Sequence, residues 1–150
     1  MTRHMVDELD MRILRELLRD GRASFRRIAE RVGASVSTVA SRVESMEREG
    51  IIRGYAAMVD PQKLGYEITA IIALRISKNL LEVQRRIARN PHVYGVYDVT
   101  GEADSIVLAR FRTREELSRF VKSMLAMEEV ERTITHIVLD IVKEDPRPPI

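Results

Sequence analysis

The chain has 150 residues, a formal net charge of +2 and an ordinary globular composition, with 45% hydrophobic and 32% charged residues. It contains no cysteine, which excludes disulfides, thiol chemistry and a zinc site with cysteine ligands. No apolar run approaches the ~20 residues of a membrane span, and no signal peptide is visible. We therefore expect a cytoplasmic protein that does not associate with a membrane.

The first predicted element is an amphipathic helix near the N-terminus. Residues 1–5 show no pattern and are equally compatible with a native start at Met5 and with a cloning remnant. Asp7 is placed to cap a helix that runs to about Asp20, and Gly21 ends it. Leucines and one isoleucine recur at helical spacing and predict a single buried face.

Two further helices are predicted between residues 24 and 50, separated by a tight turn. Ser24 caps the first, which ends at about Val32, and Gly33 breaks it. Ser35 caps the second, which ends at Gly50. Its predicted buried stripe consists of Val36, Val39, Val43 and Met46. Three helices with this short turn are typical of a helix-turn-helix domain of the winged-helix-like kind.

The outer face of the last helix is rich in hydroxyls and arginines, which reach phosphates and base edges when a helix lies in a major groove. A polar helix pair is usually only a solvated bundle. Serine and threonine are poor helix formers, so helix propensity does not explain their number on this face. The acidic residues gather in the C-terminal half of the helix and leave its N-terminal half free to approach DNA. We therefore predict binding of double-stranded DNA. The predicted DNA-binding residues are Arg22, Arg26, Arg27, Ser35, Ser37, Thr38, Ser41 and Arg42.

A break at residues 61–65 separates two predicted domains. The preceding residues, up to Asp60, are expected to form a short extended linker strand, and Pro61 and Gly65 then interrupt any element. We place a DNA-binding domain at residues 1–60 and a second domain at residues 61–150.

The second domain alternates strands and helices in the order βαββαβ, which is the ferredoxin-like pattern and makes the chain α+β. Capping boxes are predicted at Asn79 and Thr113. The proline-rich end is expected to be poorly ordered or an arm over a neighbour. The predicted strands are residues 66–77, 92–100, 105–112 and 130–142, with helices at residues 79–90 and 113–125.

The first strand of this sheet is apolar on both faces. One face carries Ile68, Ala70, Ile72 and Leu74, and the other carries Thr69, Ile71, Ala73 and Ile76. Because two helices cover only one face of such a sheet, the second apolar face predicts association. We expect two sheets to pair face to face in a homodimer.

The ordered set of motifs resembles the leucine-responsive/asparagine (Lrp/AsnC, feast-or-famine) family of transcription regulators. The resemblance spans about residues 6–143. It rests on VDELDMRIL (6–14), DGR (20–22), IAERVGASVSTVASRVESMEREGII (28–52), GY (54–55), VDPQKLG (59–65), VTGEAD (99–104) and TITHIVLDIVK (133–143).

The resemblance implies sequence-specific transcription regulation, dimers that assemble further, often to octamers, and a small effector, typically an amino acid, bound between dimers. It places the effector at the turn of residues 101–104, where Asp104 would hold an ammonium group and Gly101 would allow close approach. Ala103 departs from the aromatic or polar residue that the family often has. The implied effector-binding residues are Thr100, Gly101, Glu102, Ala103, Asp104 and Thr135.

Two alternatives remain open from the sequence. Some relatives of this family are haem-pathway decarboxylases, but the three histidines, His4, His92 and His136, are scattered and indicate neither a catalyst nor a ligand set. The second alternative is a nucleoid-type protein that coats DNA and does not respond to an effector. We predict no enzyme activity, no cofactor and no metal site, because the chain has no catalytic triad, phosphate-binding glycine loop or metal-ligand spacing.

Overall fold

The computed structural model describes residues 5–150, so His4 and most of the unpatterned N-terminal segment lie outside the described residues. The chain forms two compact units. The first contains the residues up to Met58 together with Asp145–Ile150, and the second is Val59–Glu144. The proline-rich tail thus belongs to the first unit, where the Arg147 guanidinium donates to the Leu18 carbonyl at 3.2 Å.

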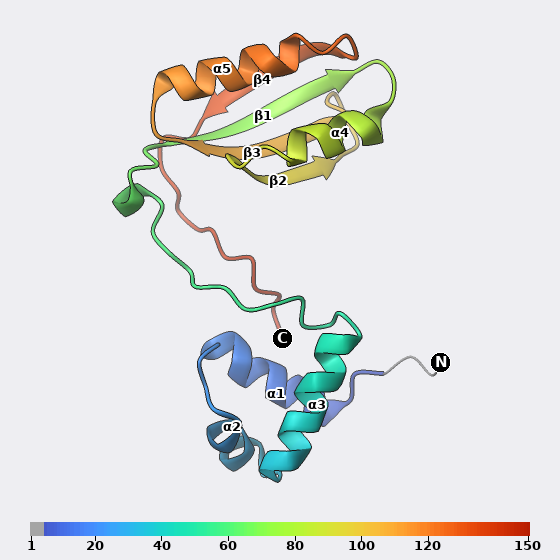
Figure 1. Ribbon diagram of the computed structural model, residues 1–150, viewed down its shortest axis with the longest axis vertical. Helices are drawn as coiled ribbons and strands as arrows, with labels where there is room; N and C mark the ends of the chain where they lie inside the picture. The colour runs from blue at the N-terminus through green and yellow to red at the C-terminus, as the bar shows by residue number, and fades with distance from the viewer. Residues whose placement is uncertain (1–4) are drawn as a thin grey trace. The chain divides into compact units, whose positions relative to one another are not determined.

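Three helices build the first unit, as predicted (Figure 1). Their apolar faces meet in a core centred on Ile13, Ile28, Val39 and Met46, each with no solvent exposure. Val36 was predicted to belong to the buried stripe, but it lies in the first turn of the third helix and is 47% exposed. The helices are α1 (Glu8–Arg19), α2 (Phe25–Val32) and α3 (Val36–Arg48).

The predicted caps explain where these helices begin and end. The side chains of Asp7, Ser24 and Ser35 each accept a backbone N–H from the first turn of their helix. Gly33 ends α2 in the left-handed conformation, with φ of +67°. These local signals set the short turn between α2 and α3.

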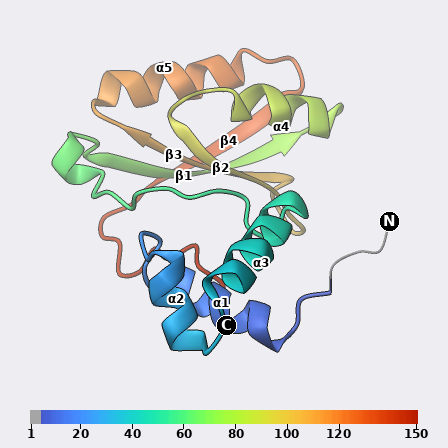
Figure 2. The ribbon, with the colours of Figure 1, turned by 60° about the horizontal axis from the view of Figure 1, so that its bottom comes forward.

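The second unit is a four-stranded antiparallel sheet in the order β2-β3-β1-β4, which is the ferredoxin-like arrangement expected. Helices α4 and α5 lie on the same face of the sheet in both views (Figures 1 and 2). Its elements are β1 (Ile68–Ile76), α4 (Leu80–Ala88), β2 (Val93–Asp98), β3 (Ser105–Phe111), α5 (Arg114–Leu125) and β4 (Val130–Ile137).

The two faces of the sheet differ in burial. Alternate β1 residues from Ala70 to Ile76 pack under the helices, so Ile76 belongs to the buried face and not to the open one. On the open face Ile71 is 37% exposed and Ile134 is 41% exposed. This second apolar face is the one that predicted association.

Two local expectations are corrected. Asn79 adopts a left-handed conformation, with φ of +54°, and its side chain forms no cap bond, so the capping box at α4 is absent. Thr113 does cap α5. The described residues from Gly54 to Asp60 form no strand, since an extended segment becomes one only when another backbone pairs with it. A 3-10 turn, η1 (Gln62–Leu64), follows.

Candidate DNA-binding face and effector turn

Hydroxyl groups gather at the N-terminus of α3. Ser35 Oγ accepts the Thr38 backbone N–H at 3.0 Å, and the same oxygen lies 3.0 Å from Ser37 Oγ and 2.7 Å from Thr38 Oγ1. Ser37 and Ser41 are exposed, and no acidic residue lies in the first turn. The positive end of the helix dipole and these hydroxyls suit a phosphate or a base edge.

Two predicted arginines of α2 are exposed and held only by surface ion pairs. Arg26 Nε lies 3.3 Å from Glu30, and the Arg26 side chain is 84% exposed. Arg27 Nη1 lies 3.1 Å from Asp20, and Arg22 is also exposed. Exposed pairs contribute little to stability, so these guanidinium groups can exchange a carboxylate for a phosphate at small cost.

Arg42 is held differently, because it joins α3 to the start of α1. Its Nη1 lies 2.6 Å from Asp7 Oδ2 and 3.3 Å from both carboxylate oxygens of Asp10. The hydrogen bond from the Asp10 backbone N–H, followed by that from Arg42, lowers the pKa of Asp7 to about 2. The hydrogen bond to Asp7 in turn raises the pKa of Arg42. This arrangement orients the helix pair.

Sequence reasoning missed the part played by Asp10. It did not single out this acid, whose side chain is fully buried beneath Arg42. A buried carboxylate requires a partner. The only signal available was an acid three residues after the Asp7 cap, which is equally typical of a solvated first turn.

The predicted effector turn connects β2 to β3. Gly101 has φ of +118°, and open space surrounds the position of a Cβ there. Asp104 accepts the Ile76 backbone N–H at 2.8 Å and lies 3.8 Å from Arg75, whose Nη1 donates to the Glu102 carbonyl at 2.9 Å. The Asp104 carboxylate therefore has a structural task in addition to the predicted one.

Two of the remaining residues of the predicted effector set belong to this turn, and the third does not. Thr100 and Ala103 belong to the turn, and Thr100 is exposed. Thr135 is on the edge strand β4, directly opposite Ile72 of β1. The fold thus brings the turn to the end of the sheet and places Thr135 part-way along it, on a different strand.

The two units match two known domain types. Residues 6–53 match the family model for winged helix-turn-helix DNA-binding domains. Residues 69–148 match the model for the Lrp/AsnC ligand-binding domain, which is more than half of the chain. The chain belongs to the Lrp/AsnC family.

Transcriptional regulators of a Pyrococcus species are similar to this Lrp/AsnC protein over nearly their full length. An uncharacterized HTH-type transcriptional regulator of Pyrococcus furiosus is 48% identical over 141 residues, covering 93% of this chain and 95% of the relative. The regulator FL11 of the same organism is 33% identical, with 99% of both chains covered.

Two solved structures share the fold. A transcriptional regulator from Neisseria meningitidis in complex with L-Met superposes with a TM-score of 0.88 at 29% identity, covering 97% of both chains. AsnC of E. coli gives a TM-score of 0.87 at 26% identity, covering 97% of this chain and all of its own. This Lrp/AsnC protein is a DNA-binding transcriptional regulator.

The described histidines of this Lrp/AsnC protein give no support to the decarboxylase alternative. His92 Nδ1 lies 2.9 Å from the Arg110 carbonyl oxygen, and its ring stacks on Phe111 with 4.9 Å between centroids. His136 is exposed on β4. Within residues 5–150 no cluster of three or more histidines and acids is arranged to hold a metal ion. No helix in that range is long and apolar enough to cross a membrane.

Proposed function

We propose that this protein is a sequence-specific regulator whose binding to an operator is modulated by an amino acid bound between dimers. In this proposal residues 1–60 bind DNA, and residues 61–150 bind the effector and associate. The hydroxyl cluster at the start of α3 is the observation that carries it, because it is exposed, lacks acids and sits at the positive end of a helix.

The DNA contacts divide into two groups. Ser37, Thr38 and Ser41 approach base edges, where sequence is read, and Arg26 and Arg27 contact phosphates, which fix position. Arg22 and Ser35 complete the phosphate-facing side. Arg42 acts by orienting α3, since its guanidinium is paired with Asp7 and Asp10.

The effector is an amino acid, with L-methionine the first to test because the Neisseria relative was crystallised with it. Its ammonium group would pair with the Asp104 carboxylate, and backbone N–H groups of the turn around Gly101 would donate hydrogen bonds to its carboxylate. An effector that binds at a dimer-dimer contact favours the assembled state through its differential affinity, and so changes how the DNA-binding units are spaced.

The dimer forms through the open face of the sheet, where Ile71 and Ile134 are exposed. A two-fold dimer presents two α3 helices to half-sites about one helical turn, ~34 Å, apart. Higher assembly, such as an octamer, then builds the effector sites between dimers.

DNA binding is tested by comparing two classes of variant on an operator selected from random sequences. We expect Thr38→Ala and Ser41→Ala to change which DNA sequences are preferred. Arg26→Ala should weaken binding to all DNA sequences and make the affinity less dependent on salt. The ratio of specific to non-specific affinity at fixed salt separates a regulator from a DNA-coating protein. Unchanged binding in all three variants contradicts the assignment of this face.

The effector is tested by thermal shift with the twenty amino acids and by calorimetry of the best one. Asp104→Asn is the informative variant, because asparagine retains an acceptor for the Ile76 amide but loses the charge. We expect weaker effector binding with unchanged effector-free DNA affinity. Asp98→Asn, an exposed acid at the end of β2, serves as the matched control. Equal effector affinity in wild type and Asp104→Asn contradicts the proposed site.

A further inference from the structure

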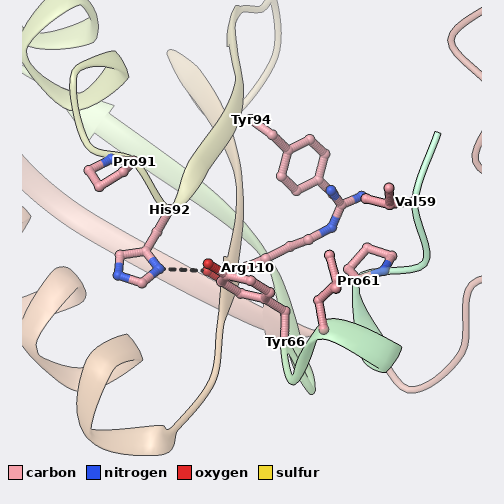
Figure 3. A pocket seen from close by; sticks show the side chains of 8 residues that line it. Val59, Pro61, Tyr66, Pro91, His92, Tyr94 and Arg110 are labelled. Atoms are coloured by element: carbon pink, nitrogen blue, oxygen red, sulfur yellow. Dashed lines mark hydrogen bonds between the residues drawn. The ribbon is translucent and has the colours of Figure 1, made fainter. Parts of the chain in front are cut away.

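A cavity of about 200 Å³ lies at the end of the sheet opposite the effector turn. The chain enters β1 and β2 and leaves β3 there (Figure 3). Its walls combine apolar side chains with two tyrosines and one arginine. The residues that matter for its chemistry are Val59, Leu64, Tyr66, His92, Tyr94 and Arg110.

Arg110 is the only arginine or lysine among the described residues that line this cavity, and its guanidinium is positioned from two sides. It lies over the Tyr94 ring, with 3.9 Å from Cζ to the ring centroid, and its Nη2 pairs with the Glu144 carboxylate. Stacking on an aromatic ring holds the planar fork in one orientation. The fork is therefore fixed before any ligand arrives.

One donor of this fork is unused. Arg110 Nε is buried and has no hydrogen-bond partner. Every other buried side-chain nitrogen or oxygen among residues 5–150 has one. A buried donor without a partner carries a desolvation cost that a ligand can remove. Glu144 contacts Nη2 only, whereas a carboxylate seated on the Nε–Nη2 edge makes two parallel bonds and is held more strongly.

Tyr94 supplies a second donor for the same carboxylate. Burial, and after it the charge of Glu144, raises the pKa of the Tyr94 hydroxyl. The hydroxyl therefore stays protonated and donates at neutral pH. Glu144 already occupies Nη2 of Arg110, so a free carboxylate competes with it for that donor.

The charges around the cavity favour an acid without an ammonium group. No acidic side chain lines the cavity, and Glu144 is the acid that a ligand carboxylate would replace. The Arg112 guanidinium lies over the Tyr66 ring at 4.4 Å, which adds positive charge near the wall. Once a ligand carboxylate has displaced Glu144 from Arg110, no acidic side chain is left among the lining residues to pair with an α-ammonium group, whereas a keto oxygen carries no charge to compensate.

We propose that this cavity is a second ligand site, which binds a small keto acid or similar monocarboxylate by replacing Glu144 on Arg110. The aliphatic part of the ligand packs against Val59 and Leu64. The displaced residue, Glu144, is the last residue of the sheet unit.

The test compares α-ketoisocaproate with L-leucine, which differ only in the keto and ammonium groups. Binding is followed by calorimetry and by tyrosine emission, because the chain has no tryptophan and two of its four tyrosines line the cavity. We expect α-ketoisocaproate to bind and L-leucine to leave the emission of these tyrosines unchanged. Glu144→Gln removes the competing charge and should tighten binding about tenfold.

Two arginine variants keep the result interpretable. Arg110→Gln should abolish binding, and Arg110→Lys, which keeps the charge but loses the fork, should weaken it at least about tenfold while thermal unfolding remains cooperative. Asp104→Asn should leave α-ketoisocaproate affinity unchanged, so that failure here is distinct from failure of the effector turn. Weaker binding in Glu144→Gln, or no binding in both wild type and Glu144→Gln, overturns the proposal.

Discussion

Replacing Arg42 by alanine tests whether this residue orients the recognition helix or contacts DNA. The change leaves the fully buried Asp10 carboxylate without a guanidinium that lies 3.3 Å from both of its oxygens. Breaking a buried ion pair costs about 3–5 kcal/mol. The Arg42 side chain is 33% exposed and Asp10 keeps a bond from the Asp7 backbone N–H, so we expect about 2–3 kcal/mol, at or below the lower end of that range.

The assay combines stability and DNA binding on the full chain. Hydrogen exchange read by mass spectrometry over α1–α3 reports the free energy of opening of the first unit alone. A cost of this size lowers the unfolding midpoint of so small a unit by roughly 10 °C or more. The slope of log affinity against log salt should stay as in the wild type, because no phosphate contact is lost.

Arg26→Ala is the matched control, because Arg26 is an exposed arginine on the same unit with a surface pair only. It should change stability by less than about 0.5 kcal/mol and reduce the salt slope by about one. An orienting role of Arg42 is refuted if Arg42→Ala shows this second signature: normal protection of α1–α3 with a reduced salt slope.

Three further outcomes are expected. The pKa of Asp7 is depressed in the folded state, so its stabilisation is complete above about pH 4 and is lost as the pH falls toward about 2; Asp7→Asn should flatten the loss of helical circular dichroism in that window. Gly33→Ala should cost about 1 kcal/mol in urea unfolding, because φ is +67° there, whereas Gly21→Ala, where φ is not positive, should not. Ile71→Glu should produce monomers in sedimentation at micromolar concentration, while Leu139→Glu, at a fully exposed position outside the strands, should leave the dimer intact.

The sequence alone determined the elements and their order. Asp7, Ser24 and Ser35 cap helices through bonds to residues three positions away, and such signals can be read locally. Helical spacing in the first half and alternating apolar residues in the second set which faces are buried, so the α+β class followed. The local signal failed at Asn79, whose left-handed conformation withdraws the side chain from the expected cap.

The tertiary structure decided which partners the site residues have. Arg42 meets Asp7 and Asp10 across more than thirty residues of chain, and Asp104 binds an amide 28 residues away. Arg110 binds Glu144 across 34 residues. A charged side chain on a polar face has the same sequence signature whether it is solvated, paired or available to a ligand. Only the packing of helices and strands brings a partner within hydrogen-bond reach. The packing therefore decides whether the side chain is solvated, paired or available to a ligand.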